Sequence, residues 1–247
     1  MRLKQTRHLD GNLGYLRLAR MNERLVSSTV DHIRSFRDTA GLLIDVRDNG
    51  GGTYHILRAI YGYFVPDQAE PRVTNTAAYR LSPQFPKNHI EYRPTHRADW
   101  DGWSDAEREA IRKATADFRP EWQPPQGNFG EWHCMVLSRE RSEELDRREN
   151  QELFHYGKPV LVLCKAGSFS ATDGFLSALA DLPQVTLVGE SSGGGSGSPR
   201  HFTLSNTGVI VVLSSMASFR ANGKLLFQIR MSAFGEIETW ACQAVLA

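Results

Sequence analysis

The sequence predicts an α/β fold, and three observations support this prediction. Short apolar runs, typical of buried parallel strands, alternate with segments whose apolar residues recur at helical spacing. Polar, glycine-rich turns follow three of these runs directly. The regular pattern stops after residue 65, where eight of the eleven prolines and four of the five tryptophans lie within 66–132. We therefore expect an α/β core formed by 12–65 and 151–220, with an irregular insertion at 66–150 and an atypical tail at 221–247.

Composition narrows the class of protein. The 247 residues suffice for one large domain, which we predict over 1–247. Lys plus Arg is 29 and Asp plus Glu is 28, a net charge of +1, so we expect no nucleic-acid partner. No apolar run reaches the ~18 residues of a membrane-spanning helix. The basic start has no apolar segment behind it, so we expect no signal peptide and a cytoplasmic location for the chain as given.

The first part of the core has the order strand, helix, strand, glycine-rich turn, helix. Partial alternation predicts a half-buried strand at 13–18, and an apolar stripe predicts a helix at 22–38. The apolar run at 42–46 predicts a buried strand, and a second helix is expected to begin near Thr53. This order predicts a right-handed βαβ unit.

The second part of the core repeats this logic. Its elements are a strand at 159–164, a turn at 165–169, a helix at 170–180, a strand at 185–188, a flexible loop at 189–198 and a hairpin with strands at 202–204 and 209–213. In the insertion, Ser104 to Glu107 form a capping box that predicts a helix to about Phe118. We expect the insertion to be a structural cover packed by its tryptophans, or else a lid or substrate wall.

The turn at 49–52 contains three consecutive glycines. Their backbone N–H groups are able to face an oxyanion without a side chain in the way. A tight strand-to-helix turn is the alternative, and it would need only one or two glycines. The loop at 189–198 is rich in glycine but lacks a phosphate-binding motif, so no nucleotide site is predicted.

Ser170 is placed where a predicted strand turns into a helix. There the helix dipole favours negative charge, and the N–H of Ala171 is able to donate to a tetrahedral oxyanion. The alternative is a helix cap, because Ser170 and Asp173 also form a capping-type pattern. The histidines are scattered without metal-ligand spacing, so no metal site or cofactor is predicted, and His55 and His201 lie nearest the glycine-rich turns. Three widely spaced cysteines predict buried thiols.

Taken in order, four segments resemble the tail-specific, or C-terminal processing, peptidases, the family that includes the tricorn protease core. The segments are Gly14-Tyr15-Leu16-Arg17-Leu18, then Gly41-Leu42-Leu43-Ile44-Asp45-Val46-Arg47-Asp48-Asn49-Gly50-Gly51-Gly52, then Gly167-Ser168-Phe169-Ser170-Ala171-Thr172-Asp173, then Leu187-Val188-Gly189-Glu190. The motifs are specific as a set, although no single one is.

The resemblance implies a crotonase-like fold of stacked ββα units. It implies that Ser170 is the nucleophile, and that the N–H groups of Ala171 and of Gly51 or Gly52 form the oxyanion hole. It also implies a peptide or protein substrate, and homo-oligomers are compatible with it.

The residue that serves as the general base in the family has no match in this chain. In the processing branch a lysine follows the serine by twenty-five residues, where this chain has Gly195. The tricorn-like branch, to which the chain looks closer, uses a histidine from before the first strand, and His8 is the histidine present there. The base is therefore unassigned, with His8, His201 and His55 as candidates. A family acid near the C-terminus is also not matched.

Three functions follow, of which a serine-type peptidase is the first. The second is a peptide- or ligand-binding member of the same scaffold that has lost its base, as the retinoid-binding relatives indicate. The third is an acyl-CoA enzyme on the related crotonase fold, although no CoA site is recognisable. The chain also looks short at both ends against the family pattern, so we expect a truncated or catalytically incomplete domain as one explanation of the missing base.

Overall fold

The computed structural model describes residues 6–82, 93–145 and 153–226. These residues divide into two compact units. The first unit lies within Met1–Ala69 and Leu137–Gly194, and the second within Glu70–Val136 and Gly195–Leu226. Segments 195–220, which the sequence groups with the core, thus cluster with residues of the insertion.

The first unit is built on a five-stranded sheet with the order β1-β2-β3-β7-β8. Its strands are β1 (Thr6–Leu9), β2 (Leu13–Arg17), β3 (Gly41–Asp45), β7 (Val160–Cys164) and β8 (Val185–Gly189). β1 is antiparallel to β2, and the other pairs are parallel. Every residue of β3 and β7 is buried, as their continuous apolar sequences predict.

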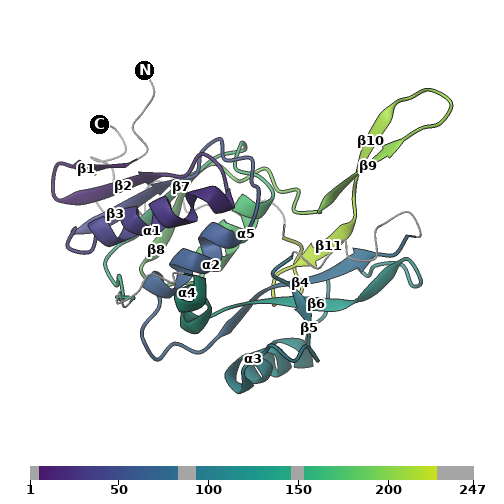
Figure 1. The fold of residues 1–247 in the computed structure, drawn as a ribbon, viewed down its shortest axis with the longest axis horizontal. Coiled ribbons are helices and arrows are strands. Elements are labelled where there is room, and N and C mark those ends of the chain that lie inside the picture. Colours follow the sequence, from purple (N-terminus) through teal and green to yellow (C-terminus); the bar gives the residue numbers. More distant parts are fainter. Residues whose placement is uncertain (1–5, 83–92, 146–152, 227–247) are drawn as a thin grey trace. The chain divides into compact units, whose positions relative to one another are not determined.

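Helices complete the first unit (Figure 1). They are the 3-10 helix η1 (Glu23–Leu25), α1 (Val26–Ser35), α2 (His55–Tyr61), the 3-10 helix η2 (Gly62–Phe64), α4 (Arg139–Leu145) and α5 (Ala171–Ala180). α1 packs against α2, and α2 packs against α4. The strands and helices predicted in both parts of the core are confirmed to within a few residues, while β1 and α4 were not predicted.

One face of the five-stranded sheet carries an apolar cluster that is formed by the strands themselves. Alternate residues of neighbouring strands meet there, because side chains along a strand point to opposite faces. The cluster consists of Leu13, Tyr15, Leu43, Leu161, Leu163 and Val188. The parallel sheet is therefore buried on both faces, as an α/β fold requires.

The prediction of an irregular insertion at 66–150 is wrong, because regular strands from this segment form part of the second unit. The segment contributes β4 (Arg72–Arg80), β5 (His96–Arg97) and β6 (Phe129–Leu137) to a four-stranded antiparallel sheet with the order β11-β4-β6-β5. The partner strand β11 (Met216–Phe219) comes from far along the chain. β4 is hard to recognise because its sequence is rich in Thr, Asn, Ala and Arg. Its stability comes from non-local pairing rather than from an apolar run.

The helix and the hairpin of the second unit are confirmed. α3 (Asp105–Ala116) begins with the predicted capping box, in which Ser104 and Glu107 hydrogen-bond each other's backbone. β9 (Pro199–Thr203) and β10 (Ile210–Ser214) form a separate two-stranded hairpin (Figure 1). The aromatic residues of the insertion pack within this unit, where His96 stacks on Trp100 and Trp132 contacts Phe219. Across the described residues, no helix has the length and apolar character needed to cross a membrane.

Candidate active site

Ser170 lies at a strained turn between β7 and α5. Its backbone has φ 60° and ψ −119°, a conformation that costs a residue with a side chain about 1–3 kcal/mol. Its side chain makes no capping hydrogen bond to the helix. Ser170 thus occupies the N-cap position of α5, but its hydroxyl does not cap the helix. A sharp, strained strand-to-helix turn is also the geometry that exposes a nucleophilic serine in other hydrolases.

The glycine turn after β3 lies directly against this serine. A Cβ atom built on Gly51 would lie 2.6 Å from the carbonyl oxygen of Phe169, 2.8 Å from Ser170 Cβ and 2.9 Å from the backbone nitrogen of Ala171. Only a residue without a side chain fits there, and Gly51 also has φ 93°. The structure thus brings together two turns that are far apart in the sequence.

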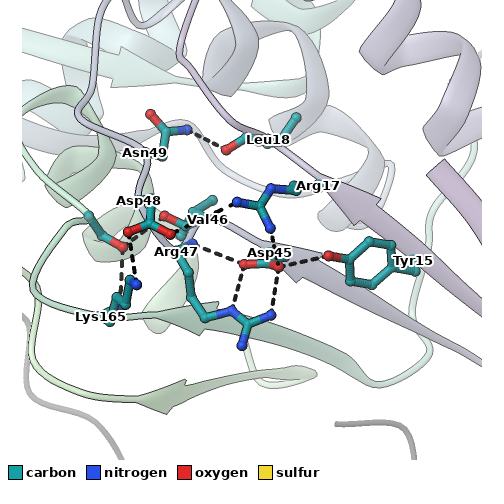
Figure 2. Close-up of polar contacts among 10 residues, drawn as sticks. Tyr15, Arg17, Leu18, Asp45, Val46, Arg47, Asp48, Asn49 and Lys165 are labelled. Carbon is teal, nitrogen blue, oxygen red and sulfur yellow. Dashed lines mark hydrogen bonds and ion pairs between the residues drawn. The ribbon is translucent and has the colours of Figure 1, made fainter. Parts of the chain in front are cut away.

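Asn49 joins the two turns. It is fully buried, and its backbone carbonyl accepts hydrogen bonds from Phe169 N (3.0 Å) and Thr172 Oγ1 (3.0 Å). Its side chain donates to the carbonyl of Leu18 (2.8 Å; Figure 2) and accepts from Gly51 N (3.0 Å). Asn49 therefore fixes the glycine turn relative to β2 and to the start of α5.

The three predicted oxyanion donors differ in their hydrogen bonds. The N–H of Ala171 opens α5, where a helix leaves its first N–H groups unpaired, and no described residue accepts from it. The N–H of Gly51 already donates to Asn49 Oδ1. Gly52 packs on Met21, and its N–H likewise finds no acceptor within the described ranges. Ala171 and Gly52 are thus the two N–H groups left available.

The candidate histidines are dispersed. Ser170 Oγ has no hydrogen-bond partner among residues 6–82, 93–145 and 153–226. His8 pairs with Gly14 at the start of β2, and its ring contacts Phe36 at 5.1 Å. The sheet register places His8 at the end of the strands opposite to Ser170, which argues against this candidate as the base.

The other two candidate histidines lie on different units. His55 opens α2 in the first unit, with its Nε2 3.9 Å from Glu23 Oε2. His201 lies exposed on β9 in the second unit.

The loop after β8, which the sequence predicts to be flexible, is hydrogen-bonded to the turn that carries Ser170. Gly194 O accepts from Ser170 N (2.9 Å), and Gly193 N donates to the carbonyl of Ser168 (2.8 Å). The carboxylate of Asp173 accepts from Ser192 Oγ (2.5 Å) and Gly194 N (3.2 Å) through Oδ1. Asp173, in the first turn of α5, therefore clamps this loop to the Ser170 turn.

Asp173 is fully buried, and no described residue hydrogen-bonds its Oδ2 atom. Burial raises the pKa of Asp173, and the hydrogen bonds from Ser192 and Gly194 oppose this only in part. A raised pKa means that the folded chain favours the protonated carboxyl. The protonated Asp173 carboxyl stabilises the folded chain fully below the pKa of this group in the unfolded chain, about 3.9. This stabilisation is lost as the pH rises through the pKa of Asp173 in the folded chain.

We therefore expect the free energy of unfolding of the wild-type chain to fall, relative to that of Asp173→Asn, as the pH rises from about 4 to 8. Urea unfolding of both proteins across this range measures the difference, in which the other titrating groups cancel. Parallel curves for the two proteins would contradict the assignment to Asp173.

A second carboxylate, Asp45, organises the end of β3 (Figure 2). It is fully buried and accepts from Tyr15 Oη (2.7 Å) and from the backbone N (3.0 Å), Nε (3.0 Å) and Nη2 (2.8 Å) of Arg47. Arg17 Nη1 lies 3.6 Å away. Burial by itself would raise the pKa of Asp45, but the hydrogen bonds from Arg47 and Tyr15 outweigh burial and lower it. Asp45 is thus a charged anchor beneath the glycine turn.

Sequence reasoning assigned no role to Asn49, Asp45 or the clamp at Asp173. A signal existed for Asp45, because it interrupts an apolar run, and a charge in such a run is expected to be paired. For Asn49 the hydrogen bond from Gly51 N is local, but its bridging role had no local signal because Leu18, Phe169 and Thr172 lie in other segments. The buried thiols predicted for Cys134 and Cys164 are confirmed, whereas Cys242 lies outside the described residues.

Known proteins resemble this chain in sequence and in fold. The sequence model of peptidase family S41 matches residues 12–230. No curated protein matches significantly. Among solved structures, a protein from Parabacteroides merdae described as a peptidase has a TM-score of 0.57 and 23% identity over 91% of this chain and 55% of that chain.

Two further structures share the fold. Mature CPAF complexed with lactacystin has a TM-score of 0.56 and 16% identity over 89% of this chain and 46% of its own. The photosystem II D1 C-terminal processing protease has a TM-score of 0.51 and 16% identity over 90% of this chain and 42% of its own. The chain thus spans about half the length of these proteins. Because the family model covers most of its sequence, this protein belongs to peptidase family S41.

Proposed function

We propose that this chain is the catalytic domain of a serine-type peptidase, with Ser170 as its nucleophile and a peptide or protein as its substrate. The observation that carries the proposal is the strained Ser170 turn, which presents the hydroxyl beside the free N–H of Ala171 with Gly51 packed against both. Membership of family S41 supports the same function. Acyl transfer needs this combination of a nucleophile and converging backbone donors.

In the reaction, Ser170 Oγ attacks the carbonyl carbon of the scissile bond. The hydroxyl proton passes to a base and then to the leaving amine as the C–N bond breaks, and water hydrolyses the resulting ester. The N–H groups of Ala171 and Gly52 hold the oxyanion, since the N–H of Gly51 is engaged by Asn49. Gly51 instead provides the space in which the Ser170 turn can form.

We infer further that the fold is crotonase-like and that the chain belongs to the tricorn-like branch. Parallel strands followed by helices, with donors from two separate turns, support the fold. Gly195 at the position of the processing-branch lysine supports the branch. We assign no base, because the described residues place no nitrogen in hydrogen-bond contact with Ser170 Oγ.

A fluorophosphonate probe tests the nucleophile. We expect it to label the wild-type chain covalently and the Ser170→Ala variant not at all, because the phosphonyl group bonds to the activated serine oxygen. Ser191→Ala, which removes an exposed serine from the neighbouring loop, is the control and should label like the wild type. Intact mass spectrometry provides the readout.

Labelling that survives in Ser170→Ala would overturn the assignment. An unlabelled wild-type chain that still binds peptides would instead favour the second candidate, a binding protein on a peptidase scaffold. The observation behind that candidate is that no base contacts Ser170 Oγ among the residues that the structure describes.

A further inference from the structure

The residue before the nucleophile is an exposed phenylalanine. Phe169 is 42% exposed, and it is the one exposed large apolar residue in the described part of the first unit. Leaving a phenylalanine in water forfeits the free energy that its burial would supply, on the order of 1.5–3 kcal/mol. An exposed aromatic ring directly beside a nucleophile is therefore a candidate contact for a ligand.

The backbone of Phe169 is fixed from two sides. Its N–H donates to the carbonyl of Asn49 (3.0 Å), and the residue forms a parallel bridge with Gly194. Its carbonyl lies against Gly51. Ser170 N donates to the carbonyl of Gly194 (2.9 Å), so the backbone that carries the ring is fixed next to the nucleophile.

One side of the ring rests on a glycine. A Cβ atom built on Gly193 would lie 3.0 Å from Phe169 Cδ2, tighter than an ordinary contact. The absence of a side chain at residue 193 therefore lets the ring lie against the backbone of the docked loop. The remainder of the ring faces solvent as a rigid apolar surface.

We propose that Phe169 is a specificity-determining residue that contacts an apolar side chain flanking the scissile bond. This proposal rests on the function proposed for Ser170. A ring one residue from the nucleophile reaches the substrate residues on either side of the attacked carbonyl. Contact between the ring and an apolar side chain removes both from water, whereas a charged side chain would lose hydration there without a partner.

Cleavage of a peptide library, read by mass spectrometry, tests the proposal in the full chain. We expect wild-type cleavage sites to be enriched in Leu, Met and Phe at the flanking positions. Phe169→Ala should lower kcat/KM for these sites about tenfold, the factor that corresponds to ~1.4 kcal/mol. It should leave sites flanked by small or charged residues unchanged. Phe169→Leu, which keeps an apolar side chain, should retain most of the preference.

Trp122→Ala is the matched control, because Trp122 is 43% exposed but belongs to the second unit. It should leave the cleavage profile unchanged. A Phe169→Ala profile identical to that of the wild type would overturn the proposal. Thermal unfolding of each variant confirms that folding is intact.

A binding experiment separates this proposal from the peptidase function. In the Ser170→Ala background, a fluorescein-labelled peptide with a central Leu-Phe pair should bind about tenfold more weakly when Phe169→Ala is added. A peptide with a central Asp-Lys pair should bind weakly to both proteins. Failure of fluorophosphonate labelling would count against Ser170 as the nucleophile and leave the role of Phe169 untouched. Equal binding of the Leu-Phe peptide with and without Phe169, or no binding of this peptide, would overturn the role of Phe169.

Discussion

Replacing Gly51 with alanine is expected to lower peptidase activity by about 10²–10³-fold, the loss typical when one oxyanion donor is displaced, because the N–H of Ala171 would move with the Ser170 turn. The new Cβ would lie 2.6 Å from Phe169 O and 2.8 Å from Ser170 Cβ, so the nucleophile turn must move. The backbone at φ 93° adds strain of about 1–3 kcal/mol for a residue with a side chain. The rate of fluorophosphonate labelling and kcat/KM on a peptide substrate both measure the effect.

Gly50→Ala is the matched control for this prediction. A Cβ on Gly50 meets nothing within 4 Å, and this neighbour lies outside the positive-φ region. The control should therefore react at nearly the wild-type rate. A Gly51→Ala variant as active as Gly50→Ala would show that the packing of the two turns is unimportant for the chemistry.

Asp45→Ala is expected to give the largest loss of stability, about 3–5 kcal/mol, because one member of a buried ion pair is removed. Tyr15 and the backbone of Arg47 lose their acceptor, Arg47 loses its counter-charge, and Arg17 keeps only the contact with Asp48. We expect the lower end of this range, because the Arg47 side chain is 43% exposed and regains hydration. Urea unfolding monitored by far-ultraviolet circular dichroism measures the change.

The control for Asp45 is Asp99→Ala. Asp99 also pairs with an arginine, Arg97, but both side chains are largely exposed, and such surface pairs contribute little to stability because water screens them. A change at Asp45 no larger than that at Asp99 would contradict the anchoring role. Because the folded pKa of Asp45 is lowered, its contribution is present above the unfolded pKa and is lost as the pH falls through the folded pKa.

The elements of the first unit were predictable because their signals are local. A continuous apolar run, as in β3 or β7, predicts a buried strand whichever elements pack against it. The helical spacing of apolar residues predicts α1 and α5 in the same way, without knowledge of their neighbours. The capping box at Ser104 is local in the same sense. β4 and β6 were missed because their stabilising partners are strands distant in sequence, and polar residues conceal the alternation of β4.

Within the site, the sequence by itself determined which turns carry nucleophile-compatible and oxyanion-compatible residues, since turn chemistry depends on neighbouring residues in the chain. Only the tertiary structure decided that Gly51 contacts Ser170, because that contact follows from β3 and β7 being adjacent strands. It also showed that the Ser170 hydroxyl does not cap α5, and that His8 lies at the opposite end of the sheet. The α/β fold predicted from apolar periodicity was therefore a local inference, while the candidate active site arises from strand order, which no local pattern encodes.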